Sequence, residues 1–260
     1  MSARAPLWSS PDVALAYREV RGVTDSVRRT WSAAFRAALP DARPRRSLDL
    51  GCGTGRFTAL LAETFGGSVI GIDASVTMLH ERPPAAGAPF TFAAGHATAL
   101  PLRARTIDLA LLSMVYHLLS PPDPVLVELR RVATPDSVVV VRTPTRELMD
   151  RVSFLPCFPG ARAIDEARMP SRAGLVEAFA HAGFECQSHA TIEQEFAASP
   201  AEALEKVRRR PFSTLQMISD AAFAEGVARY EAFCRGLPPA PLIEPLDLFV
   251  FRPLLPFPVL

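Results

Sequence analysis

The stretch Leu48-Asp49-Leu50-Gly51-Cys52-Gly53-Thr54-Gly55 decides the fold of this chain. It lies between a predicted strand, 47–50, and a predicted helix, 57–64. Its three glycines let the backbone turn sharply and approach a ligand closely, which a Cβ would block. The helix that follows presents unpaired N–H groups at its start. The stretch therefore predicts a strand, a tight ligand-binding loop and a helix.

The segments that follow alternate between short β-branched runs and helical patterns. This alternation predicts an α/β domain with a parallel sheet covered by helices. The four valines of the run 137–142 indicate a strand that is buried on both faces. The predicted strands are 68–73, 90–94, 107–113, 137–142 and 246–251, and the predicted helices include 76–81 and 123–133.

Three segments do not belong to the alternating core, and we expect them to form a lid over a site within one domain, 1–260. They are residues 1 to about 45, the Pro-rich segment 144–170, and the insertion 198–243. The insertion contains two amphipathic runs, 201–209 and 220–235, which predict helices.

Asp73 ends the strand after the glycine loop, 18 positions past Gly55. A carboxylate at that place can accept two hydrogen bonds from a ribose diol. The loop spacing is GxGxG, whereas dinucleotide-dependent enzymes use GxGxxG. An NAD-dependent oxidoreductase is therefore disfavoured.

With these motifs the chain resembles the class I S-adenosylmethionine (SAM)-dependent methyltransferases of the type-11, ubiquinone-biosynthesis-like group. The resemblance covers roughly Tyr17 to Phe184. It implies a Rossmann-like, seven-stranded, mostly parallel sheet with N-terminal helices and a helical insertion between the last two strands. It also implies SAM as cofactor, S-adenosylhomocysteine (SAH) as product, and methyl transfer to an O, N or C nucleophile.

The resemblance assigns cofactor contacts along the chain. The glycine loop would hold the methionine part of SAM and Asp73 the ribose, while Ala74 and Met78 would flank the adenine. The family usually has Gly-Asp-Ala where this chain has Gly95-His96-Ala97, so His96 or backbone amides would take the place of that aspartate. The full set of expected cofactor residues is Tyr17, Asp49, Gly51, Cys52, Gly53, Gly55, Asp73, Ala74, Met78, His96, Ala97 and Ser113.

Two residues have two possible roles each. His117 follows the fourth core strand, where ligands sit in open α/β sheets, so it is either a general base or a structural contact. Tyr17 lies on a predicted N-terminal helix, either as a lid contact on SAM or as an ordinary packing residue.

The lid segments are rich in aromatic and methionine side chains, which favour an apolar pocket for a hydrophobic or aromatic metabolite, as in secondary metabolism. The same residues would equally well form the core of the lid itself. The expected substrate contacts are Tyr116, Phe154, Phe158, Phe212, Met217 and Tyr230.

Composition and charge exclude other classes. The 28 basic and 27 acidic residues give a net charge of +1 without segregation, so no nucleic-acid partner is expected. The four cysteines are widely spaced, and no acidic cluster for a metal is evident, so we expect neither disulfides nor a metal. The start of the chain lacks an apolar leader and no apolar run is long enough for a membrane span, which predicts a cytoplasmic protein. The oligomeric state does not follow from the sequence.

The fold also permits a SAM-binding protein that transfers no methyl group, either a regulatory subunit or a catalyst of another reaction. Turnover of SAM to SAH with a panel of metabolites separates this alternative from a methyltransferase.

Overall fold

The predicted alternation of strands and helices is present in the computed structural model, which describes residues 8, 10–82 and 87–254. The strands are β1 (Arg46–Leu50), β2 (Ser68–Asp73), β3 (Phe90–Ala94), β4 (Ile107–Ser113), β5 (Ala133–Thr143), β6 (Phe184–Ala197) and β7 (Leu242–Pro253). The longer helices are α1 (Pro11–Val20), α2 (Asp25–Ala38), α3 (Arg56–Phe65), α5 (Asp123–Val132), α6 (Pro159–Arg168), α7 (Arg172–His181), α8 (Pro200–Arg208) and α10 (Asp220–Arg235). The shorter ones are α4 (Val76–His80) and α9 (Ser213–Gln216).

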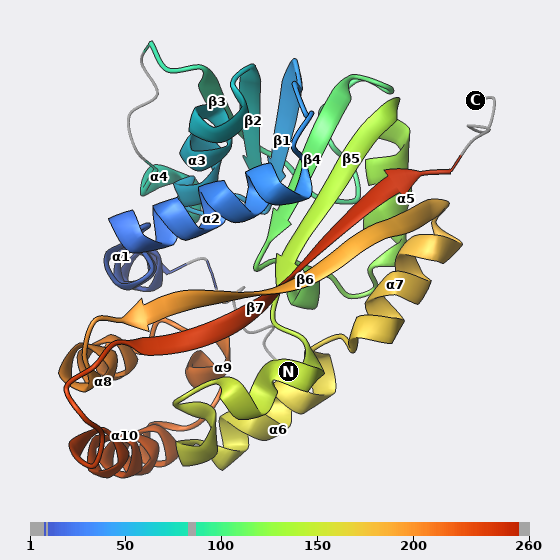
Figure 1. The fold of residues 1–260 in the computed structure, drawn as a ribbon. Coiled ribbons are helices and arrows are strands. Elements are labelled where there is room, and N and C mark those ends of the chain that lie inside the picture. Colours follow the sequence, from blue (N-terminus) through green and yellow to red (C-terminus); the bar gives the residue numbers. More distant parts are fainter. Residues whose placement is uncertain (1–7, 9, 83–86, 255–260) are drawn as a thin grey trace.

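These strands form one sheet in the order β3-β2-β1-β4-β5-β7-β6, in which β7 runs antiparallel to both of its neighbours (Figure 1). The mostly parallel, seven-stranded sheet expected from the sequence is thereby confirmed. From β1 the successive strands β2 and β3 are added on one side, whereas β4 and the later strands lie on the other side. The order of the strands therefore reverses between β1 and β4. In such a sheet the crevice outside the carboxyl ends of the strands at this switch point is the place where ligands bind.

The sheet is covered by helices on both faces, as the valine run in β5 predicts. Val138 and Val140 pack on the side of α2 and α3, and Val139 and Val141 pack on the side of α5 and α7. All four side chains are buried. A hydrogen bond of 2.8 Å from Trp31 Nε1 on α2 to Gln194 Oε1 on β6 ties the helical layer to the long outer strands.

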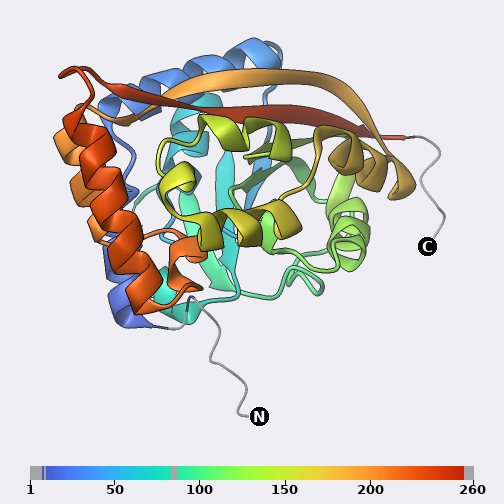
Figure 2. The ribbon, with the colours of Figure 1, turned by 90° about the horizontal axis from the view of Figure 1, so that it is seen from below.

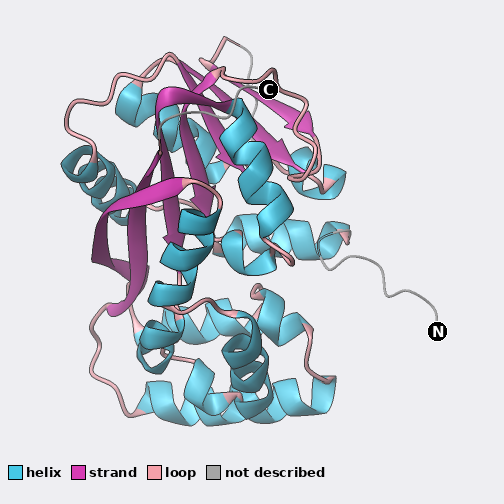
Figure 3. Cartoon of the chain, turned by 90° about the vertical axis from the view of Figure 1, so that its right-hand side faces the viewer, coloured by secondary structure: helices cyan, strands magenta, loops and turns pink. Residues whose placement is uncertain are grey.

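A second group of helices lies beyond the carboxyl ends of the parallel strands (Figures 1 and 3). It contains α6 and the three helices α8, α9 and α10 that connect β6 to β7, and in Figure 2 α6 and α10 lie nearest the viewer. The group has its own apolar core, which includes Phe158, Leu215 and Tyr230. The sequence segments 144–170 and 198–243 thus come together at the edge of the sheet where the ligand crevice is expected.

The N-terminal segment contributes α1 and α2, while residues 1–7 and 9 of the expected lid lie outside the described part of the chain. No helix among the described residues is both long and apolar enough to span a membrane.

Candidate cofactor and substrate site

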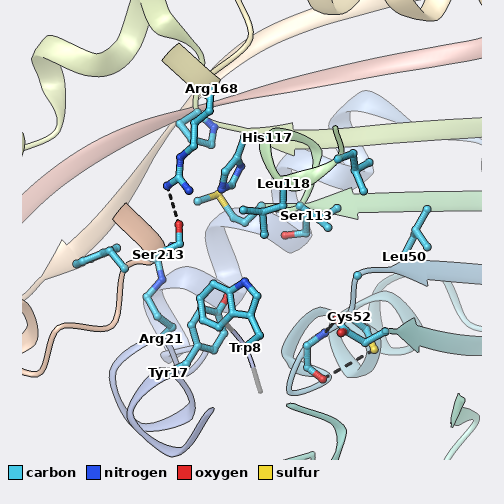
Figure 4. A pocket seen from close by; sticks show the side chains of 18 of the residues that line it. Trp8, Tyr17, Arg21, Leu50, Cys52, Ser113, His117, Leu118, Arg168 and Ser213 are labelled. Atoms are coloured by element: carbon cyan, nitrogen blue, oxygen red, sulfur yellow. Dashed lines mark hydrogen bonds between the residues drawn. The ribbon is translucent and has the colours of Figure 1, made fainter. Parts of the chain in front are cut away.

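A cavity of about 570 Å³ lies at the switch point and extends from the glycine loop to the helices beyond the sheet (Figure 4). One half is lined by the loop after β1, the end of β2 and the segment after β3. The other half is lined by residues after β4 and β5, by α6, and by the insertion between β6 and β7. One continuous space therefore joins the predicted cofactor residues to the predicted lid.

The glycine loop has the conformation that its sequence predicts. Gly51 and Gly53 have φ angles of +69° and +55°, in the left-handed region that side chains disfavour. A Cβ at Gly51 would come within 2.4 Å of Cγ2 of Val115, from the segment after β4. The N–H of Gly51 donates to the carbonyl of Ile72 at 2.8 Å, which joins the loop to the end of β2. The loop is consequently both tightly turned and closely packed from behind.

Asp73 is bonded directly to the glycine loop. Its Oδ2 accepts from the N–H of Gly53 and its Oδ1 accepts from the N–H of Ser75, both at 2.8 Å. The carboxylate also faces the cavity. Because each carboxylate oxygen has a further lone pair, Asp73 retains acceptor capacity toward a ligand diol while it holds the loop.

Asp49 is a buried carboxyl beneath the loop that also borders the cavity. Its Oδ2 accepts from the Thr58 hydroxyl at 2.7 Å, and its Oδ1 has no hydrogen-bond partner. Burial, assisted by the charge of Asp73, raises the pKa of Asp49 to about 7, against the opposing effect of the Thr58 hydrogen bond. An orphaned buried acceptor costs free energy until a donor satisfies it, so this atom fits a ligand ammonium group. Burial also raises the pKa of the adjacent Cys52 thiol, so this thiol is not a nucleophile at neutral pH.

The cavity continues from Asp73 along a largely apolar surface. Ala74 and Met78 line it from one side, and His96 and Ala97 from the other. The Nδ1 atom of His96 is 2.8 Å from the Thr98 hydroxyl, which fixes the ring and leaves Nε2 as the remaining polar atom. The residues that the resemblance assigns to the adenine therefore surround one end of the cavity.

Ser113, the last residue of β4, and His117, four residues further on, lie where the two halves of the cavity meet (Figure 4). Burial, together with the charges of Arg168 and Arg21, lowers the pKa of His117 to about 3. Its Nδ1 is buried without a hydrogen-bond partner. The imidazole is therefore neutral at physiological pH and a weak base in the protein without an acceptor.

The structure brings together most of the residues expected from the sequence. Eleven of the twelve cofactor candidates line the cavity; Gly55 does not, and instead precedes α3 with a φ of +75°. Of the substrate candidates, Phe154 and Phe212 line the cavity with their rings stacked at 4.5 Å. Phe158 and Tyr230 are buried in the core of the helices beyond the sheet, and Tyr116 packs against Phe179 in the main core. Met217 is exposed and outside the cavity lining.

Several polar residues of the cavity were not anticipated from the sequence. They come from segments far apart in the chain, and isolated arginines or glutamates give no local pattern that marks them as site residues. They are Arg21, Arg56, Asp165, Arg168, Gln194 and Glu244.

Within the part of the chain that the structure describes, no three His, Cys, Asp or Glu side chains are grouped so that they could hold an ion.

Comparison with known proteins finds a methyltransferase domain within the chain. Residues 48–141 match the model of the methyltransferase domain family, a narrower span than the resemblance predicted from the sequence. No curated protein matches the chain. This match and the sheet order described above both agree with the resemblance to class I SAM-dependent methyltransferases and with the enzyme class predicted from the glycine loop.

Solved structures share this fold at low sequence identity. A putative sarcosine dimethylglycine methyltransferase from Galdieria sulphuraria is 17% identical with a TM-score of 0.61, and the match covers 93% of this chain and 98% of that one. The [4+2]-cyclase SpnF is 18% identical with a TM-score of 0.64, covering 94% and 93%. Phosphoethanolamine N-methyltransferase 2 of Haemonchus contortus, in complex with phosphomonomethylethanolamine and SAH, is 16% identical with a TM-score of 0.63, covering 95% of this chain but 58% of that one.

Proposed function

We propose that this protein binds SAM in the cavity at the switch point and transfers its methyl group to an O, N or C nucleophile of a small, largely apolar metabolite. The observation that carries the proposal is the single cavity that joins the glycine loop and Asp73 to a second, lid-lined half. A methyl donor and an acceptor must lie side by side in such a reaction, and this cavity has room for neighbouring ligands on both sides of Ser113.

The residues present fit SAM. The orphaned Oδ1 of Asp49 suits an ammonium group, and the glycine loop leaves the space that a Cβ would fill. Asp73 has lone pairs for the ribose hydroxyls, and Met78 and His96 border the end suited to adenine. When bound, SAM supplies a methyl group on a positively charged sulfur, which is already strongly activated toward a nucleophile. A related fold in complex with SAH supports this choice of cofactor.

The protein's own contribution to such a reaction is proximity, alignment and exclusion of water. The helices beyond the sheet cover the acceptor half, where Phe154 and Phe212 offer a stacked aromatic surface. His117 is neutral and buried beside Ser113, so it is suited to accept a hydrogen bond from the acceptor. The neighbours with methyltransferase names favour a small acceptor, in agreement with the enclosed cavity.

The fold alone does not fix the reaction, because one structure of the same fold is named a [4+2]-cyclase. The deciding experiment measures SAH binding by calorimetry and SAH release from SAM with a panel of small phenols, amines and carboxylic acids. Micromolar SAH binding and acceptor-dependent SAH release are expected, on the order of −8 kcal/mol for the binding step. SAH binding without release for any acceptor would favour a SAM-binding protein of another function, and absence of SAH binding would refute the proposal.

A further inference from the structure

Three arginines form a cluster of positive charge at the cavity. The Nη1 of Arg56 donates to the backbone carbonyl of Arg21. The guanidinium groups of Arg56 and Arg142 both lie on the ring of Phe57, at 5.0 and 4.6 Å from its centroid. Arg142 is fully buried, and its Nε has no hydrogen-bond partner. The charges of Arg56 and Arg21 both act on Arg142, so the three side chains lie near one another, and Arg21 and Arg56 line the cavity.

No carboxylate of the described residues forms an ion pair with this cluster. Arg168, by contrast, forms an ion pair of 2.9 Å with Asp165. Arg142 donates to the Ser113 hydroxyl and to Gln194 Oε1, both of which are neutral. Two carboxyls act on the cluster from beyond ion-pair distance: Asp49 on Arg56, and Glu244 on Arg21. Burial raises the pKa of both carboxyls, that of Asp49 to about 7, which weakens them as counter-ions.

Buried positive charge without a counter-ion is strongly unfavourable, and arginine does not escape the cost by losing its proton near neutral pH. SAM does not provide the missing charge. It brings one carboxylate together with an ammonium and a sulfonium, so its binding adds a net charge of +1. The incompletely balanced cluster therefore favours a second anion, and the acceptor half of the cavity is the place for one.

Arg21 is the member of the cluster that can reach such an anion. Its side chain lines the cavity between Tyr17 and Ser213 (Figure 4). Its guanidinium lies over the ring of Phe212, whose centroid is 5.2 Å from the guanidinium carbon. Arg56 and Arg142 are instead fixed by the contacts given above. The N–H donors of Arg21 are consequently available for the paired hydrogen bonds that a guanidinium makes with an oxyanion.

We infer that the acceptor is a small organic acid whose carboxylate is bound by Arg21, while its apolar part lies against the stacked rings of Phe154 and Phe212. The inference rests on the proposed function, because it names the substrate class for the same cavity. It also narrows the acceptor from any small, largely apolar metabolite to one that carries a carboxylate. Such an acid is bound by charge and by apolar contact together.

The test uses the SAH-saturated protein and matched pairs of ligands. Benzoate, 3-phenylpropionate and 4-hydroxybenzoate are titrated by calorimetry, each against its amide, which has nearly the same shape without the charge. The proteins are the wild type, Arg21→Gln, Arg21→Lys, and Arg36→Gln as a control, since Arg36 is exposed on α2 and away from the cavity. SAH affinity and the melting temperature are measured for each variant.

At least one acid should bind the wild type and Arg36→Gln at least tenfold more tightly than its amide. Arg21→Gln should lose this preference while its SAH affinity stays within about threefold, and Arg21→Lys should retain part of it. The inference is overturned if no acid binds better than its amide. It is also overturned if folded Arg21→Gln loses SAH affinity by the same factor as acid affinity, because Arg21 would then serve the cofactor. Acid binding without any SAH binding would refute the proposed function and leave the acid site intact.

Discussion

The Asp73 carboxylate at the end of β2 holds the Gly53 N–H of the loop after β1, with an Oδ2 to N distance of 2.8 Å. One side chain therefore shapes the turn of the loop and also faces the cavity, so the cavity and the local fold are coupled through it.

Replacing Asp73 by asparagine should weaken SAH binding at least tenfold, about 1.4 kcal/mol, because an amide offers one acceptor where the carboxylate offers two. Calorimetric titration with SAH measures the change. Asp41→Asn is the matched control, since Asp41 is exposed and away from the cavity, and it should bind SAH as the wild type does. Unchanged affinity in Asp73→Asn would show that Asp73 is not a cofactor ligand.

The close packing of the glycine loop predicts a stability difference between two glycines with similar positive φ angles. Gly87 has a φ of +75° with open space where a Cβ would lie, and its replacement by alanine should cost about 1 kcal/mol. Gly51→Ala has a similar φ but meets Val115, and it should cost about 2–4 kcal/mol. Urea denaturation gives both values. Adding Val115→Ala to Gly51→Ala should recover part of the loss, and equal costs at the two glycines would contradict the close packing.

Because the pKa of Asp49 is raised, we expect SAH binding to depend on pH below neutrality. Its pKa is raised to about 7, so the carboxyl is protonated in acid, whereas a ligand ammonium prefers the ionised form. SAH affinity should fall by up to tenfold per pH unit from pH 7 to pH 5 and level off above pH 7. Asp49→Asn should bind more weakly at pH 7.5 and lack this dependence. A slope that persists in the variant would assign the titration to another group.

The raised pKa of Asp49 also makes the free energy of unfolding depend on pH when no ligand is present. This dependence has the opposite sign from that of a carboxylate in a salt bridge, whose pKa is lowered. The unfolded chain ionises near the ordinary value of 3.8 while the folded protein keeps its proton to about 7. The contribution of Asp49 to the free energy of unfolding therefore decreases as the pH rises from about 4 to about 7. Chemical denaturation of the wild type and of Asp49→Asn across this range should show a smaller decrease in the free energy of unfolding for the variant.

Substitutions of the expected aromatic and methionine substrate contacts should have different effects according to where these side chains lie. Phe212 lines the cavity, whereas Met217 is exposed outside it. Phe212→Ala should lower kcat/KM for an acceptor found in the panel by about tenfold, because its stacked contact is lost, and leave SAH affinity within about twofold. Met217→Ala should change neither. Equal effects of the two substitutions would place the acceptor elsewhere.

His117 should remain neutral between pH 5 and pH 8, because burial lowers its pKa to about 3. Its ring proton signal in the NMR spectrum, identified by comparison with His117→Gln, should not move across this range. A titration midpoint near pH 6 or 7 would reopen the role of His117 as a general base in the protein without an acceptor.

The sequence by itself determined the sheet and the half of the cavity that is lined by the glycine loop. Local patterns encode them: three closely spaced glycines, a carboxylate at the next strand end, and apolar runs whose period sets strand or helix. The valine run 137–142 and the loop from Leu48 to Gly55 adopt the structures that these rules predict, because the residues that they contact belong to the same motif or to the same sheet.

The acceptor half was decided by tertiary structure. The aromatic content of the insertion placed Tyr230 and Phe212 on equal terms, yet Tyr230 packs inside the group of helices beyond the sheet, where its hydroxyl lies 2.9 Å from Ser153 Oγ, and Phe212 lines the cavity. Periodicity shows that a residue is apolar and on a face, but the partner of that face depends on how distant segments pack. The arginine cluster has the same origin, since α1, α3 and β5 bring Arg21, Arg56 and Arg142 together and no local spacing in the sequence records that proximity.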